Sequence, residues 1–123
     1  MKIDKGIPDP SGKLYDLAKL KEISRGDNQF VQRMVLMFAD RIPSSLMQIW
    51  EAYNKKDFKT VRDVVHMLKP SIDNMGITII KENIQNAERL AIDDPASPLL
   101  KENLDKIDAV LLTVFEQLKE EIK

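Results

Sequence analysis

Residues 64–76 read VVHMLKPSIDNMG and contain the only histidine of a chain that has no cysteine. An α-helix turns by about 100° per residue, so the sequence alone gives the direction of each side chain around the axis. One sector of roughly 100° collects only apolar side chains: Val61, Val64, Val65, Leu68, Ile72 and Met75. His66 lies on the opposite, charged side, which also carries Lys59, Arg62, Lys69 and Asp73. The pattern predicts an amphipathic helix that presents its histidine to solvent.

The composition limits the classes of protein that are possible. A chain of 123 residues with 43% apolar and 32% charged residues is typical of one folded domain. A net charge of −1 provides no electrostatic attraction for nucleic acids or anionic membranes. The lack of cysteine excludes disulfides and thiolate metal sites, and a single histidine excludes the usual multi-histidine zinc sites, so no metal is expected. No apolar run approaches the ~20 residues that span a bilayer, and the first nine residues lack the apolar segment of a signal peptide. A cytoplasmic protein is therefore expected.

The sequence of the N-terminal quarter is typical of an irregular arm followed by a short helix. Residues 1–13 contain several glycines and prolines, which favour an irregular arm, so the folded domain is expected to span residues 14–123. Residues 14–24 are expected to form a short helix, with Leu17 and Leu20 pointing inward and Ile23 as a further candidate. Gly26 would end that helix, and Asp27 would cap the next one.

A long helical pattern covers residues 27–54. Its apolar residues recur at intervals of three, four and seven: Phe30, Met34, Phe38, Ile42, Ile49, Trp50 and Tyr53. Pro43 falls inside the pattern and removes one backbone hydrogen bond, but it points away from the apolar stripe. The pattern therefore favours one bent helix over two separate helices.

Three further helices complete the expected domain. Asp57 would cap the helix that carries His66, which should end near Asn74, with Gly76 closing it. Residues 77–91 would form the next helix, with an apolar inner face: Ile77, Ile80, Ile84, Ala87 and Ala91. After a loop at 93–96, Ser97 would cap the last helix and Pro98 would take its first position. The inner face of that helix is close to a heptad seam: Leu100, Leu104, Ile107, Leu111, Val114, Leu118 and, at its end, Glu121 or Ile122.

These expectations define a fold class. Four long amphipathic helices joined by short polar turns predict an all-α domain, an antiparallel up-down four-helix bundle with a short additional N-terminal helix. No strand pattern or internal repeat interrupts the series. A monomer is expected, because the apolar seam of the last helix would be used inside the bundle.

The motif around the histidine resembles that of the histidine-containing phosphotransfer (HPt) domain family. That motif is H-x-x-K-G-[SA], with a second glycine ten residues after the histidine. His66, Lys69, Ser71 and Gly76 match at the family's spacings. The resemblance extends over nearly the whole chain, since helix order, helix length and the proline in the second helix also agree with the family's pattern.

The resemblance implies a carrier that relays a phosphoryl group between receiver-domain aspartates and has no kinase activity of its own. His66 would be the phosphoacceptor, at Nε2, and Lys69 would stabilise the charge of the phosphoryl oxygens. Glu88, 22 residues after the histidine, would orient the ring by accepting a hydrogen bond from Nδ1–H; a glutamate that is merely solvated is the alternative. Ser71 and Gly76 would be structural, their small size letting the next helix pack closely.

The implied partners are the receiver domains of a hybrid histidine kinase and of a response regulator. No cofactor is expected, because any metal-assisted chemistry would belong to the receiver. The residues expected to face a docked partner are Arg62, Lys59, Pro70 and Asp73. Pro70 stands where the family usually has glycine, fills space beside His66 and removes the hydrogen bond to its carbonyl. We expect Pro70 to tune docking without abolishing transfer.

Two other classes of function compete with the carrier. A helical binding module could keep the bundle and dock signalling partners without phosphotransfer, and its binding would survive the loss of His66. The joint presence of His66 and Lys69 favours the carrier. An independent enzyme has least support, because the chain lacks a glycine-rich phosphate loop, a second histidine and carboxylates clustered at a recognisable spacing.

Overall fold

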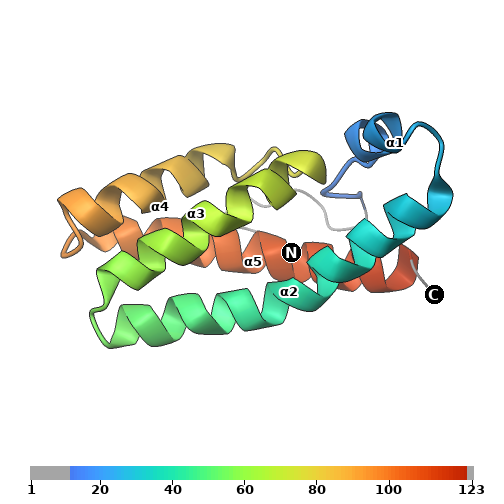
Figure 1. Cartoon of the computed structure of the whole chain (residues 1–123). Coiled ribbons are helices and arrows are strands. Elements are labelled where there is room, and N and C mark those ends of the chain that lie inside the picture. The colour runs from blue at the N-terminus through green and yellow to red at the C-terminus, as the bar shows by residue number, and fades with distance from the viewer. Residues whose placement is uncertain (1–11, 122–123) are drawn as a thin grey trace.

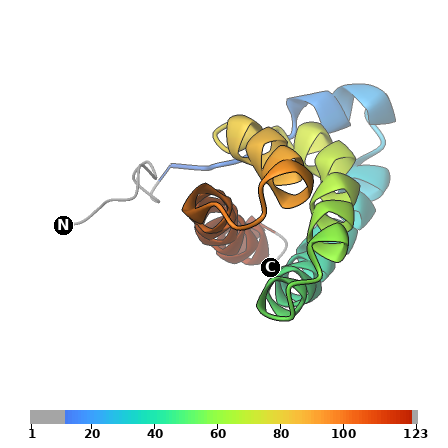
Figure 2. The same cartoon turned by 90° about the vertical axis from the view of Figure 1, so that its left-hand side faces the viewer.

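The computed structural model describes residues 12–121 as five helices, so most of the predicted arm and Ile122 lie outside the described residues. The helices are α1 (Ala18–Ser24), α2 (Asn28–Asn54), α3 (Phe58–Asn74), α4 (Lys81–Asp93) and α5 (Pro98–Glu121). Both α2 and α4 contact α3 and α5, so the four long helices close around one core, as the end-on view in Figure 2 shows. The short α1 packs against α2 at one end (Figure 1). The predicted all-α up-down bundle is confirmed.

The apolar sector predicted around the histidine helix forms the core face of α3. Val61, Val65 and Leu68 are at most 2% exposed, and Val64 and Ile72 are also buried. The predicted inner residues of α5 from Leu100 to Leu118 are buried as well. Each such side chain contributes about 1.5–3 kcal/mol relative to an exposed position. Burial of this sector fixes the rotation of α3 and therefore the outward direction of His66.

The core stripe of α2 is rotated from the predicted one. Phe38, Ile42 and Ile49 are buried as expected, whereas four predicted residues are only partly buried and pack at the edge of the core: Phe30, Met34, Trp50 and Tyr53. Smaller residues of α2 take the central positions: Val31, Val35, Ala39, Ser45, Leu46 and Ala52. The helix is continuous through the exposed Pro43 and bends in its middle (Figure 1), which confirms one bent helix.

The predicted helix caps are present. The Phe30 N–H donates to Asp27 Oδ1 at 3.1 Å at the start of α2, and the Thr60 N–H donates to Asp57 Oδ1 at 3.2 Å at the start of α3. At the start of α5 the Leu99 N–H donates to Ser97 Oγ at 3.1 Å. Each side chain accepts from a backbone N–H that has no partner within its helix.

Three helix boundaries and one candidate inward side chain differ from the prediction. Helix α1 begins at Ala18, not at residue 14, because Asp16 Oδ1 accepts from the Ala18 N–H and the Asp16 N–H donates to the Met75 carbonyl. Helix α4 spans Lys81–Asp93, not residues 77–91, although Ile77 and Ile80 are buried in the connection before it. Ile23 is 52% exposed, since α1 covers only the end of the bundle.

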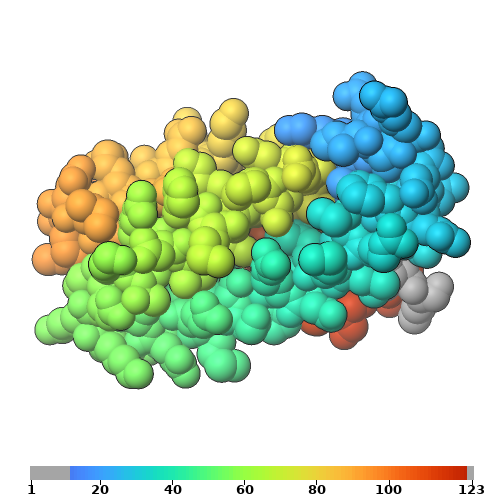
Figure 3. Space-filling model, in the orientation of Figure 1, coloured from blue at the N-terminus to red at the C-terminus, as the bar shows by residue number. Residues whose placement is uncertain are grey.

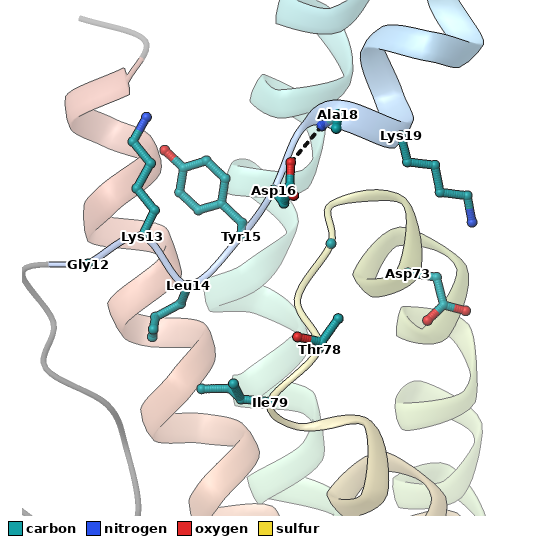
Figure 4. Close-up of a pocket in the computed structure, with 11 residues that line it drawn as sticks. Gly12, Lys13, Leu14, Tyr15, Asp16, Ala18, Lys19, Asp73, Thr78 and Ile79 are labelled. Atoms are coloured by element: carbon teal, nitrogen blue, oxygen red, sulfur yellow. Dashed lines mark hydrogen bonds between the residues drawn. The ribbon is translucent and has the colours of Figure 1, made fainter.

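Residues 12–17 form an extended segment, the N-terminal strap, that crosses one end of the bundle (Figure 4). Leu14 and Tyr15 are buried, and the Tyr15 hydroxyl donates to Glu121 Oε1 of α5 at 2.5 Å. Gln117 holds the strap twice, accepting from the Leu14 N–H and donating to the Gly12 carbonyl. An open pocket of about 650 Å³ lies between the strap and the connection from α3 to α4. The strap thus joins the end of α3 to the end of α5.

Within residues 12–121, no helix combines the length and the apolar character that crossing a bilayer requires.

Candidate functional site

His66 lies on the outer side of α3, opposite the buried sector, and its side chain is 55% exposed. Helix α3 runs between α2 and α4 across the face of the molecule shown in Figure 3, with α1 at one end. The imidazole Nδ1 lies 2.6 Å from Glu88 Oε2 of α4. Among residues 12–121, no other hydrogen bond of the ring is present. The exposure predicted from the helical pattern is therefore confirmed.

Glu88 reaches α3 because it sits at the edge of the inner face of α4. The adjacent Ala87 is fully buried, which places the Glu88 side chain at the seam between α3 and α4, where it is 15% exposed. Its other oxygen, Oε1, lies 2.9 Å from Lys69 Nζ. Glu88 is therefore not a solvated glutamate. We call His66, Lys69 and Glu88 the His66 cluster.

The electrostatics of the cluster assign the proton on the imidazole ring. Burial acts to raise the pKa of Glu88, but hydrogen bonds from Lys69 and His66, together with their charges, outweigh it and hold the pKa below its ordinary value. The carboxylate is then ionised at neutral pH and can only accept hydrogen bonds. The hydrogen between Glu88 Oε2 and the ring must therefore belong to Nδ1, which leaves the lone pair of a neutral imidazole on Nε2. In this tautomer Nε2 is a nucleophile that points away from Glu88.

The other cations predicted near His66 are engaged elsewhere. Lys59 Nζ and Arg62 Nη1 lie 2.9 Å and 3.0 Å from the two oxygens of Asp63. Hydrogen bonds from Lys59 first, and then from Arg62, lower the pKa of Asp63. These exposed pairs hold the two cations on α3 without contacting Glu88.

The remaining predicted docking residues lie at different distances from the histidine. Pro70 is exposed one turn after His66, on the same outer side of α3. Met67, which was not among the predicted docking residues, follows the histidine directly and is 67% exposed. Asp73 lies seven residues after His66, about 10 Å along the axis, and lines the pocket beside the strap. The structure therefore does not bring Asp73 into the His66 cluster.

Gly76 is structural for a different reason from the one expected. Its φ is +65°, in the left-handed region that favours glycine, and a Cβ here would lie 2.5 Å from the Asp16 carbonyl oxygen. The close neighbour is therefore the strap and not the next helix. Ser71 is half-buried on α3, and its structural role stays a prediction.

The ion pair between Lys69 and Glu88 was missed by reasoning from the sequence. The signal was present, because residues three apart on a helix share a face, so a side chain that reaches His66 from α4 also passes close to Lys69. Among residues 12–121, no group of three or more metal-binding side chains of the His, Cys, Asp and Glu types lies together.

No family model matches this chain, and neither the curated proteins nor the solved structures give a match.

Proposed function

We propose that this protein is a phosphorelay carrier of the HPt type. His66 accepts a phosphoryl group from a receiver-domain aspartate and passes it to the aspartate of another receiver. The observation that carries the proposal is the half-exposed imidazole whose Nδ1–H is held by Glu88, which leaves Nε2 as an accessible nucleophile. The spacing of His66, Lys69, Ser71 and Gly76 in the motif supports the same assignment.

The transfer step requires one nucleophile and one leaving group. The Nε2 lone pair attacks the phosphorus of the aspartyl phosphate, an N–P bond forms, and the P–O bond to the aspartate breaks. The receiver carboxylate leaves with the electron pair of that bond. The ring becomes cationic as the N–P bond forms, and the Glu88 carboxylate on Nδ1–H stabilises this charge, much as a buried aspartate does in a catalytic triad. Onward transfer is the same step in reverse, with a second receiver aspartate as nucleophile.

The position of the site suits a donor carried by a protein. His66 stands on the outer side of a helix, so a second domain can bring its own phosphorylated aspartate, and any metal ion that this aspartate needs, up to Nε2. The proposed partners are therefore the receiver domains of a hybrid histidine kinase and of a response regulator. The proposed carrier is monomeric and cytoplasmic, and it has no kinase activity or cofactor of its own.

The test is incubation with a phosphorylated receiver domain, followed by phosphate-affinity electrophoresis. Wild type should acquire an acid-labile, base-stable label, and His66→Gln should acquire none. Since His66 is the sole histidine, a phosphohistidine can form nowhere else in the chain. The free energy of unfolding of the variant should lie within about 1 kcal/mol of that of wild type, because the replaced side chain is exposed.

Two results would contradict the proposed function, and unfolding of the variant would contradict the exposed placement of His66. A label that persists in a folded His66→Gln variant would place the phosphoryl group on another residue. An unfolded His66→Gln variant would show that the histidine is needed for the fold. Receiver binding without any label on wild type would favour a helical binding module.

A further inference from the structure

The two oxygens of Glu88 are both occupied, each by a side chain of α3. Oε2 lies 2.6 Å from His66 Nδ1 and Oε1 lies 2.9 Å from Lys69 Nζ. Lys69 is 39% exposed and Glu88 only 15% exposed, so this ion pair is partly shielded from water. Lys69 is thus directed at Glu88 in the protein without a phosphoryl group.

His66 and Lys69 together fix the plane of the Glu88 carboxylate, because each contacts one of its oxygens. Glu88 extends from α4 on three rotatable bonds, and one hydrogen bond to a half-exposed ring would let the carboxylate rotate or swing toward water. The second partner, on the same face of α3, removes that freedom and supplies the positive charge that a mostly buried carboxylate needs. The direction of Oε2 toward the ring therefore depends on Lys69.

We propose that Lys69 is a positioning residue for His66, acting through Glu88: it fixes the carboxylate that holds the ring proton on Nδ1 and so keeps the lone pair on Nε2. This role differs from stabilising phosphoryl oxygens by direct contact. The effect on phosphorylation rate rests on the proposed function, whereas the effect on the tautomer does not.

The chain offers a matched control for the charge of Lys69. Arg62 is a cation on the same helix, one turn before His66, but its partner is Asp63. Removing Arg62 takes away one positive charge near the histidine and leaves the Glu88 carboxylate untouched. In the protein without a phosphoryl group, the contact of Lys69 with Glu88 distinguishes it from Arg62.

The experiment measures the tautomer of His66 by ¹⁵N NMR of its two ring nitrogens, at a pH where the imidazole is neutral. Because the chain has a single histidine, all imidazole signals belong to His66, and only its two ring nitrogens must be told apart. Wild type should show Nδ1 protonated and Nε2 unprotonated. Lys69→Met, which keeps the aliphatic stem, should lose this single-tautomer pattern and give a mixture. Lys69→Arg should restore the pattern, and Arg62→Met should leave it unchanged.

A second readout uses phosphoramidate as a small donor that needs no receiver. Nε2 attacks its phosphorus, the P–N bond breaks and ammonia leaves with a proton from solvent. Lys69→Met should react on the order of tenfold more slowly than wild type, since the lone pair is on Nε2 for only part of the time. Lys69→Arg should recover most of the rate.

The outcomes separate this inference from the proposed function. If Lys69→Met keeps the wild-type tautomer, or Arg62→Met alters it equally, the positioning role is wrong even when receivers still label His66. If the tautomer responds as expected and no receiver labels wild type, the positioning role stands and the relay function fails.

Discussion

Gly76 illustrates how a single position links the histidine helix to the rest of the chain. It follows the end of α3 with φ of +65°, and the strap passes so close that a Cβ would meet Asp16. Its match to the motif correctly indicated a structural residue. The neighbour that requires the glycine could not be predicted, because residues 14–17 of the strap were expected to be helical and the contact joins residues far apart in the chain.

Gly76→Ala should destabilise the protein by at least about 2 kcal/mol, because a left-handed backbone costs an alanine ~1–2 kcal/mol and the strap must also shift. Gly26→Ala is the matched control. Its φ is +87°, with no atom within 4 Å of the added Cβ, so it should cost only the backbone strain. Urea unfolding of both variants measures the difference. Equal losses would show that the strap does not depend on Gly76.

At the scale of the element, α3 carries both the core sector and the His66 cluster. Its rotation was predictable, because apolar side chains at helical spacing must turn inward, and the exposure of His66 follows from that rotation. The contact with Glu88 could be proposed only from the family resemblance, since nothing local specifies which side chain of α4 lies opposite residue 66. The starts of α1 and α4 were predicted too early, because apolar residues next to a helix can be buried without being helical.

Pro70 leaves the His66 carbonyl without its helical donor, since residue 70 has no N–H. Pro70→Ala should stabilise the protein by about 1–2 kcal/mol: alanine is ~3 kcal/mol better inside a helix, offset by about 1 kcal/mol of freedom gained in the unfolded chain. Thermal and urea unfolding test this, with Pro43→Ala in α2 as the comparison at a second exposed proline. Lower stability of Pro70→Ala would mean that the packing of α3 requires the proline.

At the scale of the whole molecule, the strap connects the first described residues to the last helix. Tyr15 is 6% exposed, and burial first, then the neighbouring Glu121, raises the pKa of its hydroxyl, which stays protonated and donates. The hydrogen bond from Tyr15 first, and then that from Lys13, lowers the pKa of Glu121. No periodic pattern in the sequence indicates the contact between Tyr15 and Glu121, because it joins an irregular segment to a helix more than 100 residues away.

A double-mutant cycle of Tyr15→Phe and Glu121→Gln measures how firmly the strap is attached. The coupling should be about 1 kcal/mol at neutral pH, since a charged hydrogen bond is strong but Glu121 is partly exposed to solvent.

Because the pKa of Glu121 is lower in the folded protein than in the unfolded chain, its ionisation favours folding. That contribution is complete above the ordinary glutamate pKa and is lost as the pH falls through the lowered value. The coupling should therefore shrink in acid. Glu116 lies on the same helix, and its ion pair within residues 12–121 is a 3.8 Å contact with Lys119, so Glu116→Gln should show no coupling to Tyr15→Phe. A coupling for Tyr15 and Glu121 no larger than that of this control would mean that the strap is held by its buried side chains and its other hydrogen bonds, and not by the contact of Tyr15 with Glu121.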